Sequence, residues 1–230
     1  MSETKIIKAF AAQRMDHAVL KPALTDSDVR AAAAMCVARG VGDLCVRPTD
    51  AALAVSLLKG TGMTVAVVVG FPHGASRTEV KALEARLAIE DGADELDMVM
   101  NVGKFLSGDH ELVRRDIEAV IAEAKPRGVL VKVILETCLL TPEQIAAACE
   151  LAVSAGADFV KTSTGFNGEG ATPEAVSVML KTCAGRAKVK ASGGIRTWEH
   201  AAAFLEMGAE RLGVGAADKI LDDAPVESDY

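Results

Sequence analysis

The sequence predicts a closed (β/α)8 barrel, and three observations support that fold class. Short apolar strands follow predicted helices that stop at a glycine, in a repeated unit that reads ARGVGDLCV, EDGADELDMV, SAGADFVK and EMGAERLGV. Eight such strands alternate with helices, and this alternation implies parallel pairing through right-handed crossovers. Hydrophobic residues make up 50% of the chain but aromatic residues only 3%, as expected where helices cover a parallel sheet of aliphatic residues.

The predicted elements follow one another along the whole chain. We expect strands at residues 16–20, 44–47, 64–70, 95–101, 129–136, 159–163, 188–192 and 211–214, a helix in each gap, and an extra helix at residues 3–13. Eight units in 230 residues suit a closed barrel. An open doubly wound sheet is the alternative, but no G-x-G-x-x-G motif follows the first strand.

Helix starts are visible at several of the predicted loops. Thr141-Pro142-Glu143-Gln144 reads as a capping box with proline at the first helical position. The stretch Ser76-Arg77-Thr78-Glu79 has the same pattern. Thr172 and Thr197 precede two further predicted helices and are expected to be their N-caps.

The chain is predicted to form one domain over residues 1–230. No linker rich in Pro, Gly or Ser divides it. The acidic stretch 222–230 is expected to be a flexible tail, which ends at the only tyrosine, Tyr230. One hypothesis is that this phenol folds back over the site and relays a proton.

Composition excludes several classes of partner. A net charge of −7 and a pI of about 5.2 argue against a nucleic-acid partner and leave no basic patch for a membrane surface. No apolar stretch approaches the length of about 18 residues that a transmembrane helix needs. The N-terminus lacks the apolar core of a signal peptide, so we expect a cytoplasmic protein.

The five cysteines indicate reduced thiols rather than a disulfide framework. Their number is odd and none forms a C-x-x-C pair. No cluster of His, Cys, Asp and Glu has the spacing of metal ligands, so the sequence predicts no metal site.

Charged residues fall on one face of four predicted strands. Side chains alternate along a strand, and Asp97, Lys132, Lys161 and Lys190 share a face with other polar residues, Glu95 among them, while their neighbours on the other face are apolar. Helices should cover the apolar face, so the polar face must line the barrel interior near the carboxyl ends of the strands, where barrel enzymes hold their active sites. The alternative is a buried salt-bridge network that only fills the barrel.

These residue types favour chemistry through an amine. Two lysines on adjacent strands repel each other's charge, which lowers the pKa of at least one of them. The neutral amine of Lys161 can condense with an aldehyde or ketone to give an iminium, which is an electron sink. Asp97 could then move protons to and from carbon through a water molecule.

Glycine-rich turns follow the last three predicted strands. They read TGFNGEG, SGGIR and GVGAA. Backbone N–H groups at helix N-termini bind phosphate, and the loops after strands seven and eight are the usual phosphate cradle of this barrel class. The turns therefore predict an anion site beside the lysines.

Four stretches of this sequence closely resemble the deoxyribose-phosphate aldolase family: GFPHGASRTEVKALEARLAIEDGADELDMVMNVG, KVILETCLLT, DFVKTSTGF and KVKASGGIR. The resemblance runs from residue 15 to residue 217. It implies a class I aldolase on a (β/α)8 barrel that reversibly cleaves 2-deoxy-D-ribose 5-phosphate to acetaldehyde and D-glyceraldehyde 3-phosphate.

The resemblance also implies roles for individual residues. Lys161 is the expected Schiff-base lysine, Lys190 the lysine that tunes it, and Asp97 the proton shuttle. The implied substrate-binding positions are Asp16, Cys45, Lys132, Thr162, Gly165, Ser192, Gly193, Gly194, Gly215 and Ala216. No metal or other cofactor is expected, and the implied partners are a sugar phosphate and aldehydes. The implied setting is nucleoside catabolism in the cytoplasm, with a monomer or a homodimer as the assembly.

The chain departs from the family pattern in places. The family usually has a serine pair in the last glycine-rich turn, where this chain has Gly215-Ala216. His73 replaces a common leucine, and Ala18 replaces a frequent threonine. Two alternatives therefore stay open: a related Schiff-base aldolase with a different or non-phosphorylated acceptor, and a non-catalytic barrel that binds a sugar phosphate.

Overall fold

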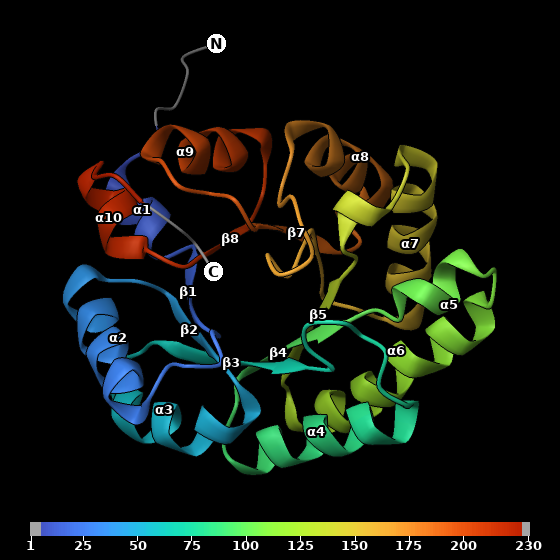
Figure 1. Ribbon diagram of the computed structural model, residues 1–230, viewed down its shortest axis with the longest axis horizontal. Coiled ribbons are helices and arrows are strands. Elements are labelled where there is room, and N and C mark those ends of the chain that lie inside the picture. Colours follow the sequence, from blue (N-terminus) through green and yellow to red (C-terminus); the bar gives the residue numbers. More distant parts are fainter. Residues whose placement is uncertain (1–5, 227–230) are drawn as a thin grey trace.

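The chain forms the predicted closed eight-stranded parallel barrel. The computed structural model describes residues 6–226. Every strand pairs in parallel with its neighbours in chain order, and β1 closes the barrel by pairing with β8 (Figure 1). The strands are β1 (Met15–Val19), β2 (Asp43–Val46), β3 (Thr64–Val69), β4 (Glu95–Val99), β5 (Leu130–Ile134), β6 (Phe159–Lys161), β7 (Lys188–Ser192) and β8 (Arg211–Val214).

Helices surround the barrel as a continuous outer ring (Figure 1). They are α1 (Lys8–Ala12), α2 (Asp26–Arg39), α3 (Ala51–Leu58), α4 (Thr78–Glu90), α5 (Val102–Leu106), α6 (His110–Ala124), α7 (Pro142–Ala155), α8 (Pro173–Cys183), α9 (Trp198–Met207) and α10 (Ala217–Asp222), with 3-10 turns η1 (Pro48–Asp50), η2 (Lys125–Arg127) and η3 (Thr137–Leu139). No helix in residues 6–226 is both long enough and apolar enough to span a bilayer.

The first three strands end one residue earlier than the sequence predicts, and the next three end two residues earlier. The strands expected at 95–101, 129–136 and 159–163 stop at Val99, Ile134 and Lys161. After β5 the chain leaves the extended conformation, because Glu136 adopts a left-handed backbone with φ 58°. The extra N-terminal helix is shorter than expected and spans Lys8–Ala12 within the described residues.

Most predicted caps are confirmed and one is wrong. Thr141 forms the full capping box, and the hydroxyls of Thr172 and Thr197 each accept a hydrogen bond from the backbone N–H three residues on. The predicted box at Ser76 does not form. Helix α4 begins one residue later, with Arg77 as N-cap, so Ser76 lies outside the capping position.

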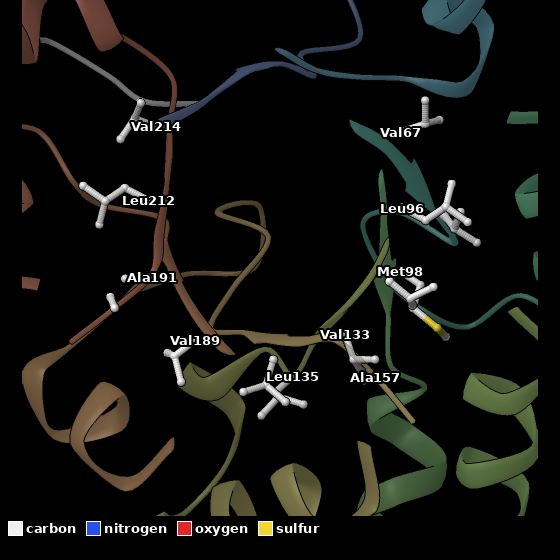
Figure 2. Packing of buried hydrophobic residues seen from close by; sticks show 14 of the residues in the cluster. Val67, Leu96, Met98, Val133, Leu135, Ala157, Val189, Ala191, Leu212 and Val214 are labelled. Carbon is white, nitrogen blue, oxygen red and sulfur yellow. The ribbon is translucent and has the colours of Figure 1, made fainter. Parts of the chain in front are cut away.

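The apolar core lies between the barrel and the helices. Leu96 and Met98 lie on the outer side of β4, toward the helix layer, as Val133 and Val189 do on other strands and Leu135 does just after β5 (Figure 2). Burial of each large aliphatic side chain contributes about 1.5–3 kcal/mol. The outer faces of the strands therefore hold the fold together, and parts of the inner faces can hold charged residues.

Only part of the predicted tail falls within the described residues. Helix α10 continues through Asp222, the first residue of that stretch. Residues 227–230, with Tyr230 and its proposed proton relay, lie outside the described residues.

Candidate active site

Three lysine side chains meet one carboxylate inside the barrel. Oδ1 of Asp97 lies 2.7 Å from Nζ of Lys132, and Oδ2 lies 2.7 Å from Nζ of Lys161 and 2.8 Å from Nζ of Lys190. The four residues come from the successive strands β4 to β7, and all are buried. The alternation along the strands therefore brought together the side chains that the sequence predicted to share the barrel interior.

A second layer of charge lies deeper in the barrel, and sequence reasoning did not assemble it. The guanidinium of Arg211 lies 2.8 Å from Asp16 and 2.9 Å from Glu95. Asp16 also pairs with Lys190, and Glu95 with Lys132. The strand alternation placed Glu95 on the polar face but predicted no partner for it, and it gave no role to Arg211. The available signal was that Glu95 occupies the same strand face as Asp97.

Asp43 belongs to this deeper layer, but its pKa is shifted upward, whereas the pKa values of Asp16 and Asp97 are shifted downward. Its Oδ2 accepts a hydrogen bond from Thr64 at 2.7 Å. Burial, together with the negative charges of Asp16 and Glu95, raises the pKa of Asp43 well above its ordinary value. The raised pKa of Asp43 reflects the excess of buried carboxylates at this level of the barrel.

Lys161 on β6 and Lys190 on β7 differ in pKa because Lys190 pairs with two carboxylates and Lys161 with one among the described residues. Burial lowers the pKa of Lys161, and the positive charge of Lys190 adds to that effect, so together they outweigh the opposing pull of Asp97. Burial also opposes charge on Lys190, but Asp16 and Asp97 outweigh it and raise the pKa of Lys190 well above its ordinary value. Lys161 is thus the better candidate for a neutral amine.

The remaining groups of the cluster hold their charge. Burial alone would raise the pKa of Asp97, but the ammonium groups of Lys132, Lys161 and Lys190 hold it well below the usual range. Burial alone would lower the pKa of Lys132, but Asp97 and the other carboxylates raise it. Lys132 is fully buried and paired, so its predicted contact with substrate stays a prediction.

Apolar side chains form a small second cluster, which we call the mouth cluster: Leu20, Cys45, Ala66 and Val68, with Ala18, Phe71 and Phe166 packed against it. The rings of Phe71 and Phe166 meet edge to face at 5.1 Å. Burial, together with the nearby Asp97, raises the pKa of Cys45 to about 12, so the thiol is protonated near neutral pH. Cys45 therefore contributes apolar surface, in keeping with its predicted place beside an aldehyde.

The predicted glycine turns come together at the carboxyl ends of β6 and β7. Gly165, Gly193 and Gly194 all have φ values between 73° and 84°, which favour glycine. Gly170 approaches Gly193 so closely that a Cβ on Gly170 would lie 2.0 Å from the Gly193 backbone. The backbone N–H of Ala171 also donates to the Gly193 carbonyl at 3.0 Å. These turns form one compact backbone surface.

Thr162 and Ser192 hold the ends of β6 and β7 together. The Thr162 hydroxyl donates to the Ser192 carbonyl at 2.8 Å and accepts from the Ser192 N–H at 2.9 Å. The Ser192 hydroxyl donates to the carbonyl of Ser163 at 2.6 Å. Both predicted substrate-binding side chains are thus committed to this join, which supports the adjacent glycine turns.

The last turn and the histidines complete the mouth of the barrel. Gly215 and Ala216 directly precede helix α10, and Ala216 provides no side-chain cap. The imidazole of His17 accepts a hydrogen bond from the N–H of Ala217 at 3.4 Å, and burial lowers the pKa of His17 to about 4. His73 is exposed.

Across residues 6–226, no group of three or more His, Cys, Asp or Glu side chains could hold a metal ion.

Gly213 is a further residue that sequence reasoning missed. It lies on β8 and faces the lysine of β7: a Cβ at Gly213 would lie 2.6 Å from Cβ of Ser192 and 3.2 Å from Cε of Lys190. A glycine inside a strand often marks such a close approach, and that was the signal available in the sequence.

Comparison with known proteins assigns the chain to a group of aldolases. Residues 10–217 match the DeoC/LacD family of aldolases. The chain is similar to the deoxyribose-phosphate aldolase of Thermococcus gammatolerans, with 49% identity over 215 residues that cover 93% of this chain and 96% of the relative. It is 47% identical to that of a Geobacillus strain over 219 residues, which cover 95% and 98%.

A solved structure agrees with these sequence relatives. The tetrameric deoxyribose phosphate aldolase of Aeropyrum pernix superimposes with a TM-score of 0.88 at 34% identity, covering 94% of this chain and 91% of that one.

The deeper charge layer predicts a large stability effect at Arg211. Arg211→Met should lower the free energy of unfolding by about 3 kcal/mol, because Asp16 and Glu95 lose their shared guanidinium partner inside the barrel. Arg186→Met is the matched control, since Arg186 binds both oxygens of Glu150 at the surface and such a pair contributes at most about 1 kcal/mol. Urea unfolding at neutral pH measures both, and equal losses would contradict the prediction.

Proposed function

We propose that this chain, which belongs to the DeoC/LacD family of aldolases and is an enzyme of the aldehyde-lyase class, reversibly cleaves 2-deoxy-D-ribose 5-phosphate to acetaldehyde and D-glyceraldehyde 3-phosphate through a Schiff base on Lys161. One observation carries this proposal: Lys161 is buried with a lowered pKa and pairs with an ionised Asp97, which also pairs with the charged Lys190. That arrangement suits an amine that must attack a carbonyl and then exchange protons.

Lys161 begins the reaction as the nucleophile. Its neutral Nζ adds to the aldehyde carbon C1 of the open-chain sugar phosphate, and loss of water from the resulting carbinolamine gives an iminium. A lowered pKa enlarges the fraction of neutral amine at a given pH. Lys190 stays charged, and its Nζ lies 2.8 Å from the Asp97 oxygen that also binds Lys161. The positive charge of Lys190 helps to lower the pKa of Lys161.

Asp97 serves the proton steps that follow. Removal of the proton from the C3 hydroxyl lets the C2–C3 bond break, which releases glyceraldehyde 3-phosphate and leaves an enamine on Lys161. Protonation of the enamine at C2 and hydrolysis of the new iminium release acetaldehyde. Asp97, ionised and within 2.8 Å of both Lys161 and Lys190, can pass protons to and from these positions through a water molecule. The iminium is the electron sink, so no step requires a metal or an organic cofactor.

The substrate lies across two chemically different regions. The mouth cluster, with Cys45, offers apolar surface for the small aldehyde. The turns with Gly165, Gly193 and Gly194 offer backbone N–H groups for the phosphate, together with the Gly215-Ala216 turn. A cytoplasmic setting in nucleoside catabolism, and assembly as a monomer or homodimer, stay predictions from the sequence.

Borohydride trapping tests the Schiff base directly. Reduction in the presence of acetaldehyde should convert Lys161 to N-ethyl-lysine, which peptide mass mapping identifies. Lys81 is the internal control, because it is fully buried with a lowered pKa yet lies outside the barrel interior, and it should stay unmodified. An adduct on Lys190 would reverse the two roles, and no adduct on a folded enzyme would remove the proposal.

The electrostatic role of Lys190 predicts a shift in pH dependence. Lys190→Met removes a positive charge and leaves Asp97 to pair more fully with Lys161, so the pKa of Lys161 should rise. Because only the neutral amine reacts, the acidic limb of the kcat/KM profile should move to higher pH, by about one unit. Lys188→Met, on the same strand but exposed, should leave the profile unchanged. An unshifted limb in Lys190→Met would contradict this role.

Ala216 favours one second candidate, an aldolase of the same mechanism whose acceptor carries no phosphate. A hydroxyl at this position would add a hydrogen bond to a phosphate, and Ala216 offers none. Comparison of kcat/KM for 2-deoxyribose 5-phosphate and for 2-deoxyribose separates the two. We expect a preference for the phosphate of at least about tenfold, since one charge-assisted hydrogen bond alone contributes that much. A ratio near one would favour the second candidate.

A further inference from the structure

A buried carboxylate at the end of β5 has no part in the lysine chemistry. Glu136 directly precedes η3 and is 1% exposed. Its backbone is left-handed, with φ 58° and ψ 61°, a conformation that residues other than glycine rarely adopt. A glycine would suit this backbone better, so the side chain that occupies the position is expected to have a function of its own.

The Glu136 carboxylate accepts its oxygen- and nitrogen-donated hydrogen bonds, among the described residues, from one loop, residues 164–170, which we call the β6 loop. Oε1 accepts from the N–H of Thr164 at 3.1 Å, and Oε2 accepts from the Thr164 hydroxyl at 2.6 Å. Oε2 also accepts from the side-chain amide of Asn167 at 2.9 Å. That amide lies 3.4 Å from the carbonyl of Pro72, which follows β3. Glu136 therefore ties the β6 loop to the end of β5, and Asn167 ties it to the turn that follows β3.

The β6 loop carries part of the glycine surface described above. Gly165 lies directly after Thr164, and its N–H lies 3.6 Å from the position that a Cβ on Gly193 would occupy. Gly170 contacts the backbone of Gly193 at the other end of the loop. A shift of Thr164 would therefore move the Gly165 N–H relative to Gly193.

The anchor is separate from the catalytic cluster. The contacts of Glu136 run to Thr164, Asn167 and, at 4.0 Å, to the thiol of Cys138. The contacts of Asp97 run to the three lysines. The two networks come from adjacent strands but share no hydrogen bond among the described residues. A change at Glu136 should thus act on the glycine turns without altering the charge around Lys161.

We propose that Glu136 is a positioning residue for phosphate recognition: its carboxylate fixes the β6 loop so that the N–H groups beside Gly165 and Gly193 bind the phosphate of the substrate. This inference rests on the proposed function for the identity of the substrate. Glu136 then sets the preference for phosphorylated over non-phosphorylated sugars and has no role in forming the Schiff base.

Glu136→Gln is the direct test, because it keeps the size of the side chain but replaces one acceptor oxygen by a donor that faces the donors of Thr164 and Asn167. We expect KM for 2-deoxyribose 5-phosphate to rise about tenfold, with kcat within about twofold. The inhibition constant of inorganic phosphate should rise in parallel. For 2-deoxyribose, kcat/KM should stay within about twofold. Glu206→Gln, an exposed carboxylate on α9, should change none of these values.

A second variant keeps the test decisive if Glu136→Gln does not fold. Asn167→Ala removes one donor to Glu136 at a half-buried position, and it should give the same selective rise in KM and in the inhibition constant of phosphate, to a smaller extent. Equal losses for the phosphorylated and non-phosphorylated sugars, or no loss for either, would overturn the proposal.

The outcome is distinguishable from failure of the proposed function itself. Borohydride trapping of acetaldehyde on Lys161 reports the chemistry without involving the phosphate, and it should proceed equally in the wild type and in Glu136→Gln. Loss of trapping in Glu136→Gln alone would place Glu136 in the chemistry and contradict a positioning role. Absence of trapping in the wild type would instead remove the aldolase mechanism.

Discussion

The rest of the site depends on the sharing of one buried carboxylate, Asp97, by three buried lysine side chains. A buried ammonium is stable only when it is paired or neutral, because burial removes its hydration. Asp97 cannot compensate three positive charges, so the interior must recruit other carboxylates or leave one lysine poorly compensated. It does both: Asp16 pairs with Lys190 and Glu95 with Lys132, whereas within residues 6–226 Lys161 pairs with Asp97 alone. Reactivity and stability thus arise from the same distribution of charge.

The closed barrel makes that unequal distribution possible. Parallel register sets Lys161 directly beside Lys190, so neither lysine can relax away from the other along its strand. Closure between β1 and β8 brings Asp16 and Arg211 into the same interior, and Gly213 on β8 leaves space for the Lys190 side chain. The helices, packed on the outer aliphatic faces, carry the stability that lets the inner faces hold so many charges.

The proposed phosphate recognition relies on backbone N–H groups rather than on side-chain charge, and such sites need accurate placement of their loops. The glycine turns approach one another closely, and Thr162 and Ser192 join the strands beneath them. Glu136 holds the start of the β6 loop, because both of its carboxylate oxygens accept hydrogen bonds from Thr164. These hydrogen bonds compensate for the cost of its left-handed backbone. A protein with a net charge of −7 can in this way attract an anion locally without a basic surface.

The sequence by itself determined the barrel and the catalytic candidates, because both follow from local periodicities. Helix stops at glycine fixed the alternation, and the two-residue period of the strands placed Asp97, Lys161 and Lys190 inward. Only the tertiary structure decided how the charges pair. Arg211 is 195 residues from Asp16 and 116 from Glu95, and strand closure alone brings them together. The left-handed turn at Glu136 was likewise invisible, since a glutamate after a strand has no local reason to adopt it; the reason is a loop that follows the next strand.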